Sequence, residues 1–384
     1  MIYERIKYNN DIIKNIIPQF SINFVDGVFV EISKGDPDKE YKLQMIHDNV
    51  LHYDITLKRG MWAKSGIKYY KNWTIRISDK IDDSLILEHN FNAENKRVYI
   101  AFDSSSIGDT LAWIPYVDEF RKKNKCKVIV STFHNDLFTN QYPDVEFIKP
   151  GQIVENLYAM YKIGWYYEND SWKPSTNPRD FKTLPLQQTI CDILGLEYKE
   201  IKPLLKLENV EKKRKIGIGL HSTAQSKYWN NPSGWQDVVD YLKGINYEVV
   251  IYSRENDGYM GNFHPKGAEK FKGGSLQDVI DDLNTCELFI GLGSGLSWVA
   301  WGCNLPVVLI SGFSKSYSET KIDTFRVINE NVCNGCFNTH KLDAGDWNWC
   351  PIHKGTDRQF ECTKMISSEM VIDKIKEALK RSSI

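Results

Sequence analysis

The stretch ELFIGLGSGLSWVAWG, residues 287–302, joins an apolar strand to a short helix through a loop of glycine and serine. The same alternation of strand and helix surrounds this stretch on both sides. The apolar periodicity predicts strands at 216–220, 247–252, 287–290 and 307–310, and helices at 235–244, 276–283, 295–302 and 368–381. Because strands that alternate with helices form parallel sheets covered on both faces, the C-terminal half is predicted to be a doubly wound α/β domain.

A second run of the same kind precedes this half. It consists of predicted strands at 97–102, 127–130 and 145–148, a helix at 110–123 after the first strand, and a helix at 186–194. Residues 151–180 have little periodicity and are predicted to be a loop or insertion, and the polar segment 207–215 is predicted to be a connector. We therefore expect another Rossmann-like domain in front of the first one.

The first hundred residues differ from both runs. Apolar residues alternate there with a period of two, which predicts antiparallel strands at 20–24, 28–32, 51–57 and 73–77. The expected domains are a β-rich domain at 1–95, a Rossmann-like domain at 96–205 and a second one at 206–384. Two consecutive α/β domains imply a cleft between them, with ligand sites beyond the carboxyl ends of the strands.

Charge and composition exclude several classes of function. The 384 residues carry 49 basic and 50 acidic side chains, and this balance leaves no overall field to attract nucleic acid or anionic lipid. The apolar runs are shorter than the roughly 20 residues of a membrane helix, and the start MIYERIKYNN has no signal-peptide core. We expect a cytoplasmic protein that neither inserts into membranes nor binds nucleic acid.

A carboxylate lies at the start of the predicted helix that follows the strand at 97–102. The loop DSSSIGD, residues 103–109, places Asp109 in the first turn of that helix. Aspartate at this position stabilises a helix start, and a carboxylate at the edge of a sheet can also accept a proton from an attacking hydroxyl. Both interpretations stay open, and they are compatible.

Two loops of the second α/β run suit phosphate groups. The loop after the strand at 216–220 carries hydroxyls and one lysine, including Thr223 and Lys227, which can bind a diphosphate or be an inert surface loop. The second loop consists of Gly293, Ser294, Gly295, Leu296 and Ser297. Its glycines permit close backbone approach, and its helix start offers free amides to an anion. Neither GxGxxG nor GxxxxGK[ST] occurs, so transfer of a sugar from a nucleotide diphosphate fits better than hydride transfer or P-loop hydrolysis.

Four cysteines near the C-terminus form the most specific pattern. They are Cys333, Cys336, Cys350 and Cys362, in VCNGC, NWCP and FECTK. Four thiolates with a CxxC knuckle suit zinc or a rubredoxin-like iron, and a complete shell of four makes the site structural. His340 and His353 lie in the same segment as possible replacement ligands, and disulfides are the alternative in an oxidising compartment. The other cysteines, Cys126, Cys191, Cys286 and Cys303, are predicted to be buried small hydrophobes.

Taken together, these motifs resemble the bacterial autotransporter heptosyltransferases. The resemblance spans nearly the whole chain and rests on IGDTLAWIP, HSTAQSKYWN, FIGLGSGLSWVAWG, and the cysteine block from CNGCF through GDWNWCP to RQFECTK. It implies a GT-B fold with a β-rich N-terminal domain for acceptor binding or assembly, and a metal finger at 332–364. It also implies an ADP-heptose donor, serines of adhesin passenger domains as acceptors, and a homo-oligomer.

The resemblance further implies a role for each candidate residue. Asp109 is the base that acts on the serine hydroxyl, Lys227 with Thr223 contacts the donor diphosphate, and Ser294 to Ser297 form the helix-start phosphate site. The four cysteines hold a ferric ion, whereas their spacing alone favours zinc. Two other functions stay open: a GT-B enzyme that transfers another sugar to a glycan or lipid, and a metal-stabilised binding module without activity.

Overall fold

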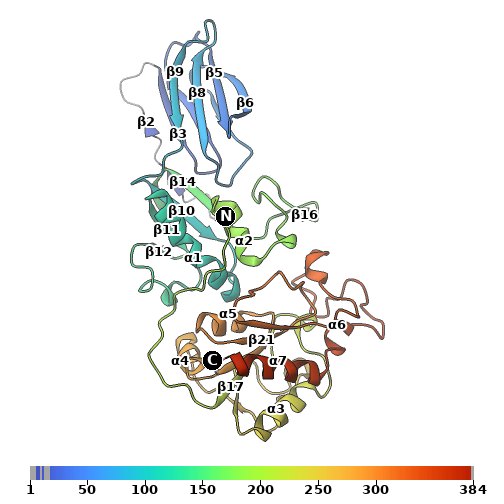
Figure 1. Cartoon of the computed structure of the whole chain (residues 1–384). Helices are drawn as coiled ribbons and strands as arrows, with labels where there is room; N and C mark the ends of the chain where they lie inside the picture. Colours follow the sequence, from blue (N-terminus) through green and yellow to red (C-terminus); the bar gives the residue numbers. More distant parts are fainter. Residues whose placement is uncertain (1–5, 9–10, 13–17, 382–384) are drawn as a thin grey trace. The chain divides into compact units, whose positions relative to one another are not determined.

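The structure, a computed structural model, describes residues 6–8, 11–12 and 18–381 (Figure 1). Most of the start MIYERIKYNN, for which we expected no signal peptide, lies outside the described residues. The chain divides into two compact units: Met1–Ser105, Trp113–Phe181 and Gln188–Lys199 form the first, and Ser106–Ala112, Lys182–Gln187 and Glu200–Ile384 form the second. Within the described part of the chain, no helix combines the length and apolar character that crossing a membrane requires.

The first unit contains two four-stranded antiparallel sheets in its N-terminal part. One has the order β2(Asp11–Ile12), β3(Gln19–Asn23), β4(Phe29–Lys34) and β7(Trp62–Lys64), and the other β6(Val50–Leu57), β5(Tyr41–His47), β8(Trp73–Asp79) and β9(Leu85–Asn90). Strands thus occupy each of the four segments for which alternation predicts them. In β5 the alternation is directly visible, because Tyr41, Leu43 and Met45 are buried and the residues between them are not.

The first unit also contains a parallel sheet. Its order is β12(Glu146–Ile148), β11(Lys127–Ser131), β10(Arg97–Phe102) and β14(Ala159–Ile163), with the helices α1(Ile107–Asn124) and α2(Leu186–Leu194). The remaining short elements are β1(Ile6–Tyr8), η2(Asn135–Leu137), β13(Val154–Leu157), β15(Tyr167–Glu168), β16(Ser171–Trp172) and η3(Phe181–Thr183).

The expectation of a loop at 151–180 is wrong, because β14 pairs in parallel with β10 along its whole length. Four of the five residues of β14 are buried, so the strand shows no alternation of polar and apolar side chains. A strand covered on both faces has no period-two pattern. Its apolar run is short and is surrounded by Trp, Tyr and Asn residues, so the pattern of the segment did not indicate a strand. The sheet therefore has four strands rather than the three predicted.

The second unit is built on a six-stranded sheet in which all strands are parallel. The order is β19(Glu269–Lys270), β18(Glu248–Ile251), β17(Lys215–Ile218), β20(Leu288–Leu292), β21(Val307–Ile310) and β22(Thr324–Val327). Its helices are α3(Gly234–Gly244), α4(Leu276–Leu283), α5(Gly295–Gly302), α6(Glu361–Lys364) and α7(Ser368–Arg381), with 3₁₀ turns η4(Gln225–Lys227), η5(Tyr259–Gly261) and η6(Cys336–Asn338). The predicted parallel α/β arrangement is confirmed for this half of the chain.

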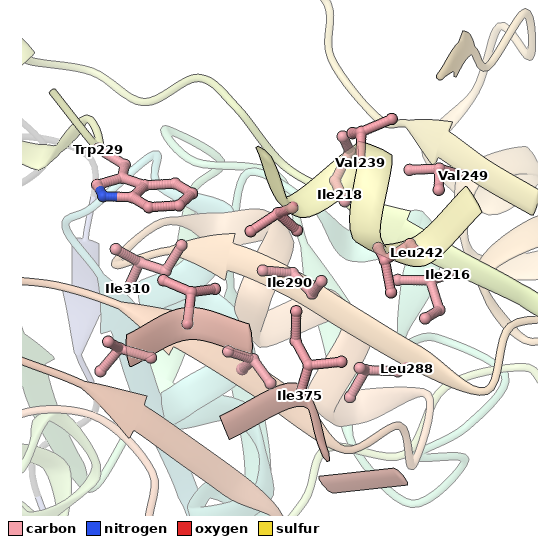
Figure 2. Packing of buried hydrophobic residues seen from close by; sticks show 14 of the residues in the cluster. Ile216, Ile218, Trp229, Val239, Leu242, Val249, Leu288, Ile290, Ile310 and Ile375 are labelled. Carbon is pink, nitrogen blue, oxygen red and sulfur yellow. The ribbon is translucent and has the colours of Figure 1, made fainter. Parts of the chain in front are cut away.

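One face of this sheet carries a large cluster of buried hydrophobic residues (Figure 2). Val239 and Leu242 of α3 and Ile375 of α7 pack there against the strand residues Ile218 and Ile290. Each of these side chains is buried, and burying one contributes about 2 kcal/mol. The opposite face receives α4, because a Cβ at Gly217 would lie 3.1 Å from Leu283. Helices therefore cover both faces of the sheet. The ends of the strands are not covered by these helices and lead into the loops.

The order of the strands decides where a ligand site can form. β17 and β20 are neighbours in the sheet, and the chain leaves β17 toward β18 on one side and β20 toward β21 on the other. The loops that follow β17 and β20 thus meet at the topological switch point of the sheet. These two loops are the phosphate-binding candidates of the sequence.

Candidate active site

The loop after β17 folds back on itself and ends in the turn η4(Gln225–Lys227). The side-chain amide of Asn230 holds this loop closed by donating to the carbonyls of Gln225, at 3.0 Å, and Tyr228, at 3.1 Å. Within the loop, Lys227 Nζ donates to Thr223 Oγ1 at 3.3 Å. The two predicted diphosphate contacts of this loop are therefore side by side.

Lys227 lies among groups of opposite charge. Burial lowers the pKa of its ammonium, while the charges of Asp109 and Glu319 raise it. Its Nζ also lies 5.0 Å from the centre of the Phe313 ring, within the range of a cation–π contact. A half-buried lysine with a lowered pKa is a poorly hydrated cation, and an anionic ligand would stabilise its charge.

The Gly-rich loop after β20 leads directly into α5. Ser294 is the N-cap residue in an extended conformation, and its side chain makes no capping hydrogen bond. Ser297 Oγ instead donates to the carbonyl of Leu292 at 2.6 Å and fixes the turn from inside. The backbone amides at the start of α5 can therefore receive an anion.

The first turn of α1 packs against the start of α5. A Cβ at Gly295 would lie 2.4 Å from Ile107 Cγ2, and one at Gly108 would lie 3.4 Å from the Cα of Gly295. Glycine at both positions thus permits a close approach of the two backbones. Asp109 follows as the third residue of α1, so it is not the N-cap residue, although its carboxylate still lies in the first turn.

These contacts bring the predicted catalytic and phosphate-binding residues together in the second unit, to which the first turn of α1 belongs. Asp109 supplies a carboxylate, Lys227 a cation, and the start of α5 a set of amides. A proton acceptor beside an anion site can support attack by a hydroxyl with departure of a phosphate. Sequence reasoning did not single out Glu319 or Phe313, which lie after β21. Phe313 belongs to the stretch PVVLISGFS that follows the Gly-rich loop and its helix, and Glu319 lies outside every motif of the sequence.

The four C-terminal cysteines also gather in one place. Cys336, Cys350 and Cys362 are buried and Cys333 is half-buried, and all eight cysteines of the chain are free thiols. Burial raises the pKa of Cys362 to about 12, and the charges of Cys333, Cys336 and Cys350 act in the same direction. Gly335 in the CNGC knuckle has φ = 72° and ψ = 30°, the left-handed conformation that turns such a knuckle.

A second set of possible ligands lies beside Cys333. One ligand atom each of Cys333, His353 and Glu361 falls within 4.8 Å of the others. The Glu361 carboxylate, however, already accepts from Arg358 at 2.6 and 2.7 Å and from the Cys333 amide at 3.2 Å. Thiolates match the preference of zinc and iron better than a carboxylate held by an arginine. The four neighbouring cysteines suit such a metal in their donor chemistry, while among the described residues it is Cys333, His353 and Glu361 whose ligand atoms lie within 4.8 Å of one another.

The cysteine segment contacts the Lys227 loop through its tryptophans. The amide of Gln225 donates to the carbonyl of Trp347 at 3.0 Å, and the Trp347 ring lies 5.5 Å from the ring of Tyr228. Trp349 packs on Phe313, the residue beneath Lys227, at 5.6 Å. Through these contacts, the cysteine segment can affect the conformation of the Lys227 loop.

The remaining cysteines, Cys126, Cys191, Cys286 and Cys303, are buried, as predicted. Burial raises the pKa of Cys126, Cys191 and Cys303 to about 12 and that of Cys286 to about 11. Thiols with such values are poor nucleophiles at neutral pH, so these four residues serve packing.

Comparison with known proteins identifies the class and then the family. No protein-family model matches the chain. Its fold matches the iron-containing dodecameric heptosyltransferase TibC of enterotoxigenic E. coli H10407, solved with ADP-D-β-D-heptose, with a TM-score of 0.86 and 31% identity over 98% of this chain and 100% of that one. The fold of the E. coli ADP-heptose lipopolysaccharide heptosyltransferase II also matches, with a TM-score of 0.52 and 12% identity over 75% and 100% of the two chains. The chain is therefore a glycosyltransferase with the GT-B-like α/β fold of the heptosyltransferases.

Sequence relatives narrow the class further. The autotransporter heptosyltransferase Aah of Escherichia coli is 36% identical over 364 residues, which cover 90% of this chain and 92% of Aah. The chain belongs to the autotransporter heptosyltransferases. The predicted resemblance is thereby confirmed.

Proposed function

We propose that this heptosyltransferase transfers heptose from ADP-glycero-manno-heptose to serine hydroxyls of an autotransporter adhesin passenger domain, with inversion at the anomeric carbon. The donor is supported by the complex of TibC with ADP-D-β-D-heptose, and the acceptor class by the name of Aah. The observation that carries the proposal is the position of Asp109 beside Lys227, next to the start of α5.

In this proposal Asp109 accepts the proton of the serine hydroxyl as its oxygen attacks the anomeric carbon. The new carbon–oxygen bond forms on the face opposite the leaving group, and the bond from carbon to the β-phosphate oxygen breaks. ADP leaves with the bonding electron pair, and Lys227, Thr223 and the amides from Ser294 to Ser297 stabilise its charge. Gly293 and Gly295 let the backbone approach the phosphates. Positioning and electrostatics supply the acceleration.

Substitution of Asp109 and Lys227 tests this assignment. Asp109→Asn and Asp109→Ala should lower the transfer rate by at least about a hundredfold, the usual contribution of a general base, while ADP still binds. Asp103→Asn is the matched control, since Asp103 is an exposed carboxylate of the same loop whose bond is to Tyr166 OH at 2.8 Å. Intact mass of a co-expressed adhesin reports transfer, and calorimetry reports ADP affinity. Substantial turnover by the Asp109 variants would remove its role as base.

Lys227→Met should weaken ADP binding by about tenfold or more, because a hydrogen bond to a charged group contributes about 1.5–3 kcal/mol. Lys243→Met, at an exposed position near the end of α3, is the control for loss of a positive charge. Equal ADP affinity of wild type and Lys227→Met would exclude a direct contact between Lys227 and the diphosphate.

We further propose that Cys333, Cys336, Cys350 and Cys362 hold a ferric ion, with zinc as the alternative. Support comes from the gathered thiols and from TibC, which contains iron. When bound, such an ion supplies a structural cross-link, since four thiolates leave no open position for a reaction. Elemental analysis with an absorption spectrum distinguishes the two metals, because ferric tetrathiolate is coloured and zinc tetrathiolate is not. Cys333→Ser should lose the metal and fold or assemble poorly; a metal-free, folded and fully active variant would refute the proposal.

The domain roles belong to the same proposal. Residues 1–95 bind the acceptor or mediate assembly, 96–205 supply the acceptor side with the catalytic base, and 206–384 bind the nucleotide sugar and include the metal finger at 332–364. TibC is dodecameric, which supports a homo-oligomer for this chain. Light scattering on the purified protein measures the oligomeric state. Deletion of residues 1–95 should abolish transfer or assembly while ADP still binds.

A different donor is the second candidate, namely another nucleotide sugar transferred to a glycan or lipid. Incubation with a panel of nucleotide sugars and an adhesin fragment separates the two candidates. Transfer from ADP-heptose to the fragment supports the first, and transfer from another donor to a glycan or lipid supports the second.

A further inference from the structure

We propose that the contact between Asn230 and Thr363 couples the cysteine segment to the Lys227 loop, so that a metal ion at the four cysteines and ADP at Lys227 strengthen each other's binding. Asn230 is a positioning residue in this inference, because it acts through the loop that carries Lys227. The inference rests on the proposed function, which assigns the metal to the cysteines and the diphosphate to Lys227. It adds that the two sites depend on one another.

The side-chain amide of Asn230 bonds to both segments. Its Nδ2 donates to Thr363 Oγ1 at 2.8 Å, in addition to the two carbonyls within the loop. Its Oδ1 accepts from Gln225 Nε2 at 2.5 Å. The Thr363 hydroxyl donates to the carbonyl of Phe360 at 3.3 Å, so its oxygen is the acceptor of the bond from Asn230. Thr363 is 1% exposed, and the contact is therefore shielded from solvent.

Thr363 belongs to a segment with little regular structure. It directly follows Cys362 within α6, a helix of four residues. Residues 328–367, all of which the structure describes, contain η6 and α6 as their only regular elements. Such a segment is ordered by side-chain contacts and cross-links, and binding of a structural metal is coupled to its folding. Loss of the proposed metal ion should therefore loosen Cys362 and the neighbouring Thr363 together.

Two further hydrogen bonds join the same parts of the chain. Trp229 Nε1 donates to the carbonyl of Ile366 at 2.9 Å, and Asn231 Nδ2 donates to the same carbonyl at 3.0 Å. Trp229 and Asn231 flank Asn230 in the sequence. Three consecutive side chains at the end of the Lys227 loop are thus bonded to the end of the cysteine segment and the residues just after it.

These contacts fix both ends of the turn that carries Lys227. The turn begins at Gln225, whose amide is bonded to Trp347. It is closed by Asn230, whose amide is bonded to Thr363. A cation that is already held in place loses less conformational freedom when it binds an anion, so it binds more tightly.

The expected coupling is modest and reciprocal. A hydrogen bond of ordinary strength changes an equilibrium constant by about two- to tenfold, and we expect the bond from Asn230 to Thr363 to contribute a factor of this size. Coupling between two binding equilibria acts equally in both directions, so ADP should raise the metal affinity by the factor by which the metal raises the ADP affinity.

The test measures ADP affinity by calorimetry in metal-loaded protein and in protein depleted by a chelator. Thr363→Val removes the hydroxyl with little change of shape and leaves Asn230 its two carbonyl acceptors. In loaded protein it should weaken ADP binding by about two- to tenfold, whereas Thr363→Ser keeps the hydroxyl and should restore the affinity of wild type. The ratio of the ADP affinities of loaded and depleted protein should be smaller in Thr363→Val than in wild type. In an Asn230→Ala background, Thr363→Val should cause no further change.

Thr285→Val is the matched control. Thr285 Oγ1 donates to the carbonyl three residues earlier, that of Asp282, at 2.7 Å, as Thr363 does to Phe360. Thr285 lies between α4 and β20, at the amino ends of the strands and thus at the edge of the sheet opposite the Lys227 loop. Its substitution should alter stability in urea denaturation and leave the ADP affinity of loaded and depleted protein unchanged.

The possible results separate this inference from the proposed function. Wild-type ADP affinity in loaded, folded Thr363→Val would overturn the inference, and so would an equal ratio of loaded to depleted affinity in the variant and in wild type. If depleted protein does not fold, the comparison of loaded wild type, Thr363→Val and Thr363→Ser decides alone. Wild type that binds no ADP or holds no metal would instead overturn the proposed function and this inference with it.

Discussion

His221 makes the stability of the second unit depend on pH in a way that the structure quantifies. Burial lowers the pKa of His221 from 6.5 to about 4, with His264 and Lys270 acting in the same direction and Asp257 opposing them. The residue is 8% exposed, its ring lies 5.6 Å from that of His264, and its Nδ1 is 2.6 Å from Ser253 Oγ. The ring therefore sits in the fold as neutral imidazole.

The direction in which stability changes with pH follows from the protonation of His221 in the folded and in the unfolded chain. The unfolded chain binds a proton at His221 below pH 6.5, whereas the folded chain does so only below about pH 4. Protons thus stabilise the unfolded state, and stability falls as the pH drops through this window. The free energy of unfolding should lose about 2 kcal/mol from this residue between pH 7 and pH 5, and about 3 kcal/mol once the pH is below 4.

Urea denaturation of wild type and His221→Gln at pH 7 and pH 5 isolates this contribution. Both proteins share every other titrating group, so the loss from pH 7 to pH 5 should be about 2 kcal/mol smaller in His221→Gln. Equal slopes against urea at the two pH values ensure that the same unfolding reaction is compared. An identical loss in the two proteins would show that His221 is solvated in the fold and would refute the reasoning.

Two further predictions concern the cysteine segment. Gly312→Ala should destabilise the protein by about 1–3 kcal/mol in urea denaturation and reduce its metal content, because the added Cβ would lie 2.5 Å from the carbonyl oxygen of Cys362. Gly244→Ala at the end of α3, where nothing lies within 4 Å of the added Cβ, is the matched control and should cost no stability. Removal of the proposed metal ion by a chelator should weaken ADP binding measured by calorimetry, since Trp347 and Trp349 contact the Lys227 loop and Phe313. Unchanged ADP affinity in folded, metal-depleted protein would show that these contacts do not position the loop.

Sequence patterns predicted four of the six strands and the longer helices of the second unit, because each of these elements carries its own local signal, whereas the short elements β19, β22 and α6 were missed. The helix at 276–283 is an example: Ser275 and Asp278 form a capping box at its start, and Ile280 and Leu283 provide the buried stripe. The strand at 307–310 is fully buried and ends at a turn, so its length and composition marked it. Such signals depend on residues only a few positions apart, and a single sequence displays them.

The strand β14 could not be predicted from local sequence signals. Its burial depends on its pairing with β10, about sixty residues earlier in the chain, and nothing within AMYKI encodes that partner. The same holds for the cysteine segment. Its spacing predicted a cluster of four thiols, while its contact with Gln225 and Tyr228 arises from residues more than a hundred positions away.

Gly293 shows that a glycine in a candidate phosphate loop can also be required by a contact within the protein. From the sequence, glycine in the loop after β20 indicates that the backbone must approach a phosphate. In the structure, the atom nearest to the missing side chain of Gly293 is Oε1 of Glu319, a group that would repel phosphate. At Gly295, by contrast, a Cβ would meet Ile107 and Gly108. The two glycines therefore have different nearest neighbours, a carboxylate at Gly293 and the first turn of α1 at Gly295. Gly293 follows β20 and Glu319 lies in the segment after β21, and these two strands are paired in parallel, so their carboxyl ends lie at the same edge of the sheet. A single sequence does not display this pairing.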